Sequence, residues 1–256
     1  MVTNKFKSTV IVGIIMSLLL VGSVSAALIA QYEFEGNANN SVGRENGTLK
    51  GGAHTVIDPE RGWVLALDGI DDFVLGSDSL FDFVDTTFTA CGWFRKSDAA
   101  EGIIVSEGGK ASGWVLDVSP VGEIEVLLKA GNGFDGYRAT SITNSYADGQ
   151  WHHVAAVITT NTSSASGNNA DIYVDGTLVS ATHVRTNPYG PSPLEWSIGA
   201  RDIGYRTTFF NGMIDDVRVY DFALTADQLN KYVIPEPASI VLIAMGGLLL
   251  RGKKQL

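Results

Sequence analysis

The chain of 256 residues contains a single cysteine and few of the residue patterns that common enzyme classes need. One cysteine cannot form an internal disulfide, so stability must come from a hydrophobic core. We interpret Cys91, between Ala90 and Gly92 in a strand-like run, as a small buried apolar residue. The sequence has no Gly-x-Ser-x-Gly and no His-Glu-x-x-His motif, which argues against the hydrolases and metalloproteases that use them.

Basic residues are scarce as well, with 18 Lys and Arg against 28 Asp and Glu, a net charge of −10. Residues 1–26 and 233–256 each carry a net +2, so the body between them carries −14. Such a body repels phosphates and anionic lipid, which excludes nucleic acid as the expected partner. It suits a soluble protein outside the cell, and its oxygen atoms suit Ca²⁺. The alternative for most of these charges is a solvated acidic surface.

Long apolar runs are absent, since a membrane-spanning helix needs roughly 17–25 apolar residues and both apolar ends are shorter. At the N-terminus Lys5 and Lys7 precede an apolar core over 10–21 and small residues over 24–26. This order predicts a signal peptide over 1–26, cut by signal peptidase after Ala26. The alternative is an uncleaved N-terminal anchor.

The C-terminal segment 233–256 has three consecutive parts. A Pro235-Glu236-Pro237 motif is followed by an apolar run over 238–250 and then by the basic residues Arg251, Lys253 and Lys254. This order resembles the PEP-CTERM sorting signal of Gram-negative bacteria. The resemblance implies a short transmembrane helix held in the inner membrane, recognition by an exosortase, and delivery to the cell surface or extracellular matrix.

Between the two ends, residues 27–232 have the size of one all-β domain. Period-two patterns and turn residues separate many short apolar runs, which predicts an antiparallel two-sheet sandwich or jelly roll. Asp175-Gly176 between two such runs predicts a tight hairpin. One helix is expected over 226–232, with Thr225 as its N-terminal cap. The predicted strands cover 28–35, 64–67, 73–75, 88–94, 102–106, 113–118, 123–129, 151–159, 170–174, 177–180, 194–198 and 213–220.

Three motifs in this body resemble the LamG-like jelly roll of the concanavalin A-like lectin/glucanase superfamily. They are Leu67-Asp68-Gly69-Ile70-Asp71-Asp72-Phe73-Val74, the run from Asp148 to Ala155 with Asp171 to Gly176, and the run from Phe210 to Tyr220. The resemblance implies two antiparallel sheets packed face to face and ligand sites on loops or on the concave sheet. It also implies a frequent structural Ca²⁺, but it fixes no ligand.

Two acidic groups are candidates for cation binding. First and last strands are often neighbours in such a jelly roll, so we predict a structural Ca²⁺ on Glu35, Asn37 and Asp216 with backbone carbonyls. The alternative is that these are solvated turn residues. For the second group, Asp68, Asp71 and Asp72, we favour turn stabilisation through side-chain to backbone hydrogen bonds.

Two further pairs of residues are considered for metal binding and for catalysis. His152 and His153 are neighbours on a strand and should point to opposite faces, so we do not expect them to bind one metal ion. Glu123 and Glu125 share a strand face, but the further acid of the Glu-x-Asp-x-x-Glu signature of related glucanases is missing. We therefore predict no enzyme activity.

Aromatic residues in or near loops are candidates for stacking on sugar rings. Tyr137, Tyr189 and Tyr205 are the ones we select for a binding rim. Core or sheet-edge packing is the alternative for most of the others, which are Trp93, Trp114, Tyr146, Trp151 and Trp196.

The sequence thus predicts an exported, non-catalytic binding protein, with an extracellular polysaccharide as its expected ligand. One alternative is a structural or adhesive matrix protein that binds other proteins. A further alternative is a glycoside hydrolase that has lost or replaced the usual acids.

Overall fold

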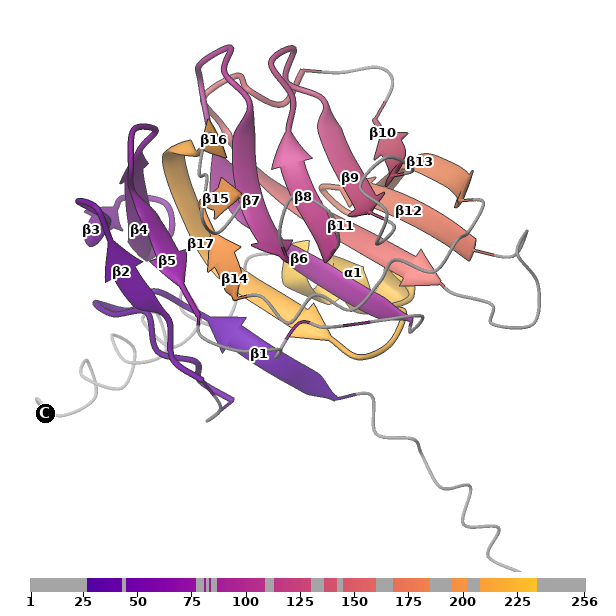
Figure 1. The fold of residues 1–256 in the computed structure, drawn as a ribbon, viewed down its shortest axis with the longest axis horizontal. Coiled ribbons are helices and arrows are strands. Elements are labelled where there is room, and N and C mark those ends of the chain that lie inside the picture. The colour runs from indigo at the N-terminus through magenta and orange to yellow at the C-terminus, as the bar shows by residue number, and fades with distance from the viewer. Residues whose placement is uncertain are drawn as a thin grey trace, which may run out of the picture.

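Two antiparallel β-sheets pack face to face in the computed structural model (Figure 1). The structure describes residues 27–42, 45–76, 81, 83, 87–108, 113–129, 136–141, 145–159, 168–184, 195–201 and 208–233. This architecture confirms the predicted all-β sandwich of the jelly-roll type. The predicted signal peptide over 1–26 and the sorting segment over 234–256 lie outside the described residues. Within the described part, no helix has the length and apolar character needed to cross a bilayer.

The first sheet, called sheet A, has eight strands in the order β13-β12-β11-β6-β17-β4-β3, and β1 also pairs with β17. The first and last strands are therefore neighbours, as predicted. The strands of sheet A are β1 (Leu28–Tyr32), β3 (His54–Asp58), β4 (Gly62–Asp68), β6 (Phe88–Arg95), β11 (Trp151–Thr159), β12 (Asn168–Val174), β13 (Thr177–Val184) and β17 (Asn211–Tyr220).

The second sheet, sheet B, has seven strands in the order β10-β9-β8-β7-β14-β5-β2. A separate two-stranded sheet joins β15 (Ala200–Arg201) to β16 (Thr208–Phe209). The strands of sheet B are β2 (Thr48–Lys50), β5 (Phe73–Leu75), β7 (Gly102–Glu107), β8 (Gly113–Val118), β9 (Ile124–Lys129), β10 (Gly136–Thr140) and β14 (Trp196–Ile198).

The main core lies between the sheets, because alternate residues of each strand point inward. In β6 the inward residues are Phe88, Ala90 and Phe94, all fully buried. From sheet B, Trp114 in β8 and Trp196 in β14 enter the same core with 1% and 0% of their surface exposed. Both belong to strands rather than loops, which confirms core packing as their role and excludes them as stacking platforms for a ligand.

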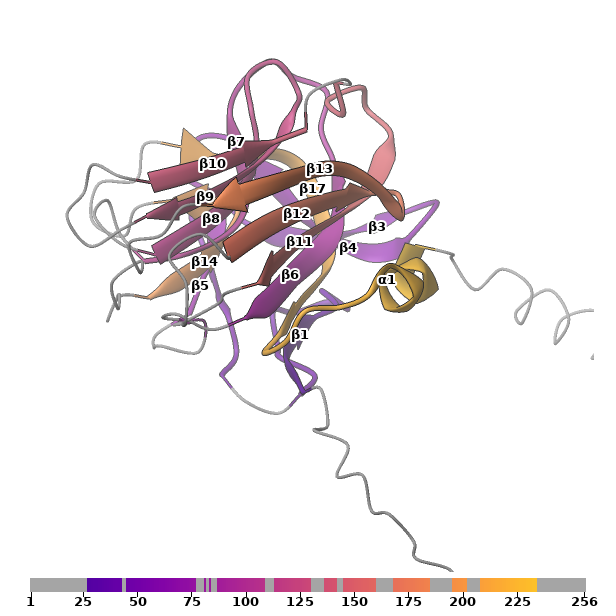
Figure 2. The same cartoon turned by 90° about the vertical axis from the view of Figure 1, so that its right-hand side faces the viewer.

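Helix α1 (Ala226–Val233) lies on the outer side of sheet A (Figure 2). A second, smaller core lies between this helix and the sheet. Leu229 of the helix and Cys91 of β6 are both buried in it, which confirms the interpretation of Cys91. Thr225 caps the helix as predicted, since its Oγ1 accepts the N–H of Gln228 at 3.3 Å. The Gln228 side chain accepts the N–H of Thr225 in return at 2.9 Å, which completes a capping box.

Local turn chemistry sets other boundaries of the fold. Asp175 (φ 49°) and Gly176 (φ 76°) form the predicted hairpin turn between β12 and β13. The first strand ends at Tyr32, earlier than predicted, and Phe34 two residues later has φ of 54°. The sequence prediction also missed β2, β3 and β10, which are short or lie at sheet edges.

Candidate functional site

A pocket of about 310 Å³ opens at the edge of sheet A where β4 and β6 end and β17 begins. We call it the rim pocket. Its walls come from four separate parts of the chain, and its size falls at the lower end of the range for small-molecule sites. It is lined by Ala66, Leu67, Arg95, Lys96, Ser97, Gly149, Asn211, Gly212 and Met213.

Small residues form part of the pocket lining. Gly212 has φ of 145°, and a Cβ at this position would lie 2.2 Å from the backbone oxygen of Arg95. Only glycine fits there, so β17 approaches β6 closely at the pocket. Ala66 has a short side chain and Gly149 has none, so neither fills the pocket.

Polar groups stand at the mouth and the back of the rim pocket. Ser97 and Asn211 are exposed, whereas the side chain of Lys96 is 0% exposed. Asp98 joins them, because its carboxylate pairs with Lys96 Nζ and accepts Asn211 Nδ2 at 2.7 Å. Burial lowers the pKa of Lys96 to about 8. These contacts fix the loop after β6 against the start of β17.

An aromatic and cationic cluster continues from the rim pocket along the outer face of sheet A. We call Arg61, Trp93, Arg95 and Trp151 the Arg–Trp cluster. The Arg61 guanidinium lies 4.1 Å from the Trp93 ring centre and 5.4 Å from that of Trp151. Arg95 lies 5.1 Å from the Trp151 ring centre on the pocket side. Stacking of this kind holds the guanidinium of Arg95 in place beside the pocket.

Two buried carboxylates neutralise this cluster. Asp58 binds Arg95 Nη2 at 2.6 Å and accepts Trp151 Nε1 at 3.1 Å, and Asp215 binds Arg61 Nε at 2.7 Å. Burial alone would raise the pKa of Asp58, but hydrogen bonds and the Arg95 charge lower it overall. At Asp215 burial prevails over Arg61 and raises the pKa to about 6.

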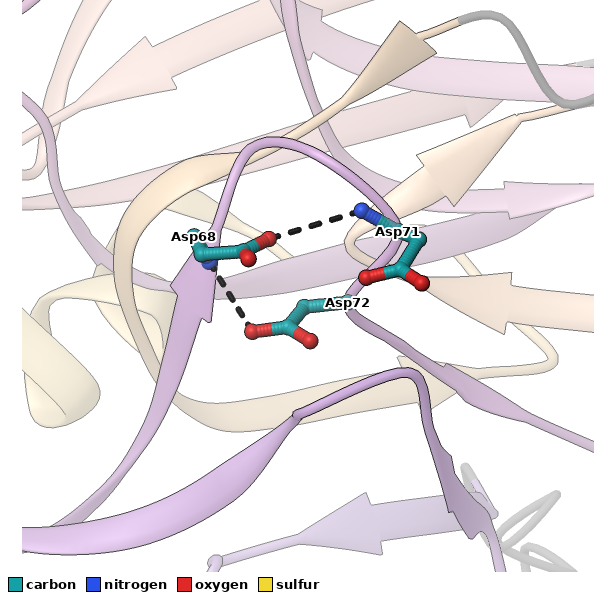
Figure 3. A group of neighbouring side chains, drawn as sticks. All are labelled: Asp68, Asp71 and Asp72. Atoms are coloured by element: carbon teal, nitrogen blue, oxygen red, sulfur yellow. Dashed lines mark hydrogen bonds between the residues drawn. The ribbon is translucent and has the colours of Figure 1, made fainter.

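The acidic loop of Asp68, Asp71 and Asp72 borders the rim pocket, because Asp68 is the strand partner of Asn211. Figure 3 shows the three carboxylates of this loop. One carboxylate oxygen from each of the three lies within 4.8 Å of the others, a spacing that suits a cation such as Ca²⁺. The loop also supports its own turn, since Asp68 Oδ1 accepts the N–H of Ile70 at 2.8 Å. Asp72 accepts the N–H groups of Gly52 and Asp68, which confirms the predicted turn role.

Of the residues predicted to hold a structural Ca²⁺, Asp216 lies in β17, whereas Glu35 and Asn37 lie in the loop after β1. Asp216 lies at an irregularity of β17 (φ 47°), where Arg218 contacts its two oxygens at 2.8 and 2.7 Å and Gln31 Nε2 donates at 3.0 Å. Asn37 Oδ1 accepts the N–H of Asn39 at 2.7 Å, and Glu35 is exposed. The protein thus supplies partners to Asp216 and Asn37, and this calcium site stays a prediction.

The histidine pair points to opposite faces of β11, as predicted. His153 is 2% exposed and lies edge-on to Trp93 at 5.3 Å between ring centres. His152 points the other way and bridges Asp175 Oδ2 at 2.8 Å and Asp148 Oδ1 at 3.2 Å. The hydrogen bond with Asp175 raises the pKa of His152. The two rings cannot share one ion from opposite faces.

The glutamates considered for catalysis are separated by the start of β9. Glu123 precedes the strand, whereas Glu125 is buried within it and lies directly opposite Asp117 of β8. Sequence analysis missed Asp117, because only the pairing of β8 with β9 brings it beside Glu125. The prediction that the chain has no enzyme activity stays a prediction.

The tyrosines selected for a binding rim fall largely outside the described residues. Tyr189 and Tyr205 lie outside them, and Tyr137 lies in β10 with a side chain that is also outside the described part. Tyr146 is buried and packs edge-on against His152.

With this fold and pocket in view, the chain belongs to the concanavalin A-like lectin/glucanase superfamily, whose model matches residues 68–230. No curated protein sequence matches the chain. Membership of the superfamily agrees with the jelly-roll fold and leaves the ligand open.

Solved structures share the fold at low sequence identity. Domain 4 of AbnA, a GH43 extracellular arabinanase from Geobacillus stearothermophilus in complex with arabinotriose, is 17% identical with a TM-score of 0.64, over 82% of this chain and 99% of that one. The binding domain of Paraclostridial Mosquitocidal Protein 1 is 12% identical with a TM-score of 0.65, over 80% and 51%. The ligand binding domain of botulinum neurotoxin serotype D, in complex with N-acetylneuraminic acid, is 16% identical with a TM-score of 0.60, over 80% and 50%. The chain thus spans about half the length of the two toxin chains.

Proposed function

We propose that this chain is an exported, non-catalytic protein that recognises a polysaccharide at the rim pocket. The observation that carries the proposal is the pocket itself, where exposed Ser97 and Asn211 offer a hydroxyl and an amide group. Small-molecule sites are concave, and a few precisely placed hydroxyl or amide groups in them fix the orientation of the ligand. The arabinotriose and N-acetylneuraminic acid in two similar structures support a carbohydrate as the ligand class.

Contacts within the protein hold the polar groups of the pocket in fixed positions, which favours ligand binding. Asp98 orients the Asn211 amide by accepting its Nδ2 at 2.7 Å, so the amide oxygen has a defined direction. Arg95 is held by Asp58 and by stacking on Trp151. A ligand hydroxyl that meets groups already in place loses less entropy on binding.

Export and sorting form the second part of the proposal. Signal peptidase would remove residues 1–26, and an exosortase would recognise Pro235, Glu236 and Pro237 while residues 238–250 are held in the inner membrane. The protein would then reach the cell surface or extracellular matrix. The described domain ends at Val233, two residues before this motif.

A structural Ca²⁺ is proposed as the cofactor, with two acidic groups as its possible holders. Either Glu35, Asn37 and Asp216 or the acidic loop would bind it. Calorimetric titration of the metal-free full chain should show heat and a raised melting temperature. Loss of both in Asp216→Asn assigns the first group, loss in Asp71→Asn assigns the second, and no heat in the unchanged chain contradicts a bound calcium.

Two other functions are kept as alternatives. A structural or adhesive role would replace the sugar with a matrix protein partner. Glycan hydrolysis would need the buried carboxylates Asp117 and Glu125 or others to act as the paired acids. Hydrolysis would be contradicted if the Glu125→Gln variant still binds the glycan and the unchanged chain releases no reducing sugar from it.

A glycan array of the full chain, run with Ca²⁺ and with chelator, tests the main proposal. Ser97→Ala with Asn211→Ala should weaken binding of the recognised glycan roughly tenfold or more, because two hydrogen-bonding groups are lost. Asn230→Ala on the exposed side of α1 is the matched control and should bind as the unchanged chain does. Binding to matrix proteins and to no glycan would favour the adhesive alternative.

A further inference from the structure

We infer that the rim pocket selects neutral sugars and rejects sugars that carry a carboxylate. This specificity rests on the proposed function, since it concerns the same pocket. It follows from which charges near the pocket are already paired and which carboxylates remain.

The cations at the pocket are already neutralised by carboxylates of the protein. Arg95 binds Asp58 at 2.6 Å, and Lys96 pairs with Asp98. The Lys96 side chain is 0% exposed, so a ligand cannot reach its ammonium group without displacing Asp98. Arg95 is 25% exposed, and its Nη1 already faces Glu60 at 3.6 Å.

Carboxylates outnumber the cations around the pocket. Arg95 is shared by Asp58 and Glu60, and Glu60 is 67% exposed. Asp68, next to the lining residue Leu67 and opposite Asn211, is exposed as well, as is Asp71. Among the described residues, no Lys or Arg forms an ion pair with Asp68 or Asp71. The body of the chain, with its charge of −14, adds to this negative field.

A ligand carboxylate would therefore meet repulsion at the mouth and no free cation inside. To bind Arg95 or Lys96 it would have to separate an existing ion pair and leave Asp58 or Asp98 unpaired. Separating a buried pair is costly, because the remaining charge has no solvent to stabilise it. Neutral hydroxyl groups avoid this cost, because Ser97 and Asn211 can bind them without moving any charge. The chemistry of the pocket thus excludes uronic acids and acidic polysaccharides.

The test compares a neutral polysaccharide with the same polymer after oxidation of its primary hydroxyl groups to carboxylates. An array with arabinan, β-glucan, galactomannan, alginate and polygalacturonate first identifies what the full chain binds. We expect binding among the neutral polymers only, and a loss of roughly tenfold or more when the bound polymer is oxidised. The loss should shrink as salt is raised, since salt screens exposed charges.

A charge variant separates repulsion from a change of ligand shape. Glu60→Gln with Asp68→Asn removes two negative charges, and Asn at position 68 keeps the oxygen that accepts the Ile70 N–H. This double variant should recover several-fold affinity for the oxidised polymer. Glu33→Gln with Asp227→Asn removes the same charge from exposed positions outside the pocket lining and should recover none.

Each outcome has a definite meaning. Equal or tighter binding of an acidic polymer overturns the specificity and leaves the proposed function standing. An oxidised polymer that binds as well as its neutral parent does the same. Binding to none of the polymers overturns the proposed function, and the specificity with it.

Discussion

The buried His153 should make the stability of this domain fall steeply in mildly acidic solution. The imidazole is 2% exposed beside Trp93, and burial lowers its pKa to about 4. Asp175 and Asp216 favour the protonated ring, whereas Arg61 and Arg218 oppose it. In the unfolded chain the ring titrates near its ordinary pKa of about 6.5.

The sign of this effect follows from the number of bound protons. Between pH 6.5 and pH 4 the unfolded chain binds a proton at His153 that the folded chain does not, so stability rises with pH in this window. The depressed pKa therefore removes stability as the pH falls from 6.5 to 4. Between pH 7 and pH 4 the difference between the unfolded and folded pKa values acts over about 2 pH units. At 1.36 kcal/mol per unit, the free energy of unfolding falls by about 3 kcal/mol.

Urea unfolding of the full chain at pH 7, 5.5 and 4 measures this loss. His153→Phe keeps an aromatic ring against Trp93 but does not titrate. The free energy of unfolding of the unchanged chain should fall by about 3 kcal/mol more than that of the variant over this range. Because the comparison uses changes with pH, a constant packing difference between His and Phe cancels.

His54→Gln provides the matched control, since His54 lies exposed on the edge strand β3. This variant should keep the full pH dependence of the unchanged chain. Equal pH dependence in His153→Phe and the unchanged chain would refute the reasoning. It would mean that His153 binds a proton as readily in the folded protein as in the unfolded chain.

The remaining predictions concern packing, charge and capping, all measured by urea unfolding at pH 7. Leu229→Ala should cost about 2–5 kcal/mol of stability, because Leu229 of α1 is 0% exposed. Leu178→Ala, at 47% exposure, should cost far less. Equal costs would contradict the packing of α1 on sheet A. Arg61→Met should cost about 3–5 kcal/mol of stability, because it leaves buried Asp215 unpaired. Adding Asp215→Leu should restore most of that loss. A double variant as unstable as the single one would show that the lost ion pair is not the cause. Thr225→Ala should cost about 1 kcal/mol by removing the cap of α1, and Thr225→Ser should cost much less; no difference between them would exclude the capping box.

Several elements of the fold follow from local sequence chemistry. The hairpin at Asp175-Gly176 and the helix after Thr225 depend on turn and cap residues whose preferences act within a few positions. The long strand β11 carries a run of small and β-branched residues that predicts it directly. In contrast, β2 and β3 have mostly exposed or half-buried residues and exist because β5 and β4 supply their hydrogen-bond partners.

Local sequence signals did not predict the candidate site. Trp114 and Trp196 could not be assigned to the core from the sequence, because the register of their strands decides which face they occupy. Asp216 has oxygen atoms that suit calcium, and only the pairing of β1 with β17 brings Gln31 beside it. Its contact with Arg218 is local, because both residues lie in β17.

The sequence by itself determined the class of the fold and the acidic character of the body, because composition and short-range periodicity act within each segment. Tertiary structure decided where a ligand has room to bind. The rim pocket joins residues 66–67, 95–97, 149 and 211–213, which come together only when β4, β6 and β17 pair. Tertiary structure also decided how the charge of Arg95 is balanced, since Asp58 of β3 reaches Arg95 of β6 only once sheet A is assembled, whereas the pair of Lys96 with Asp98 is local in the chain.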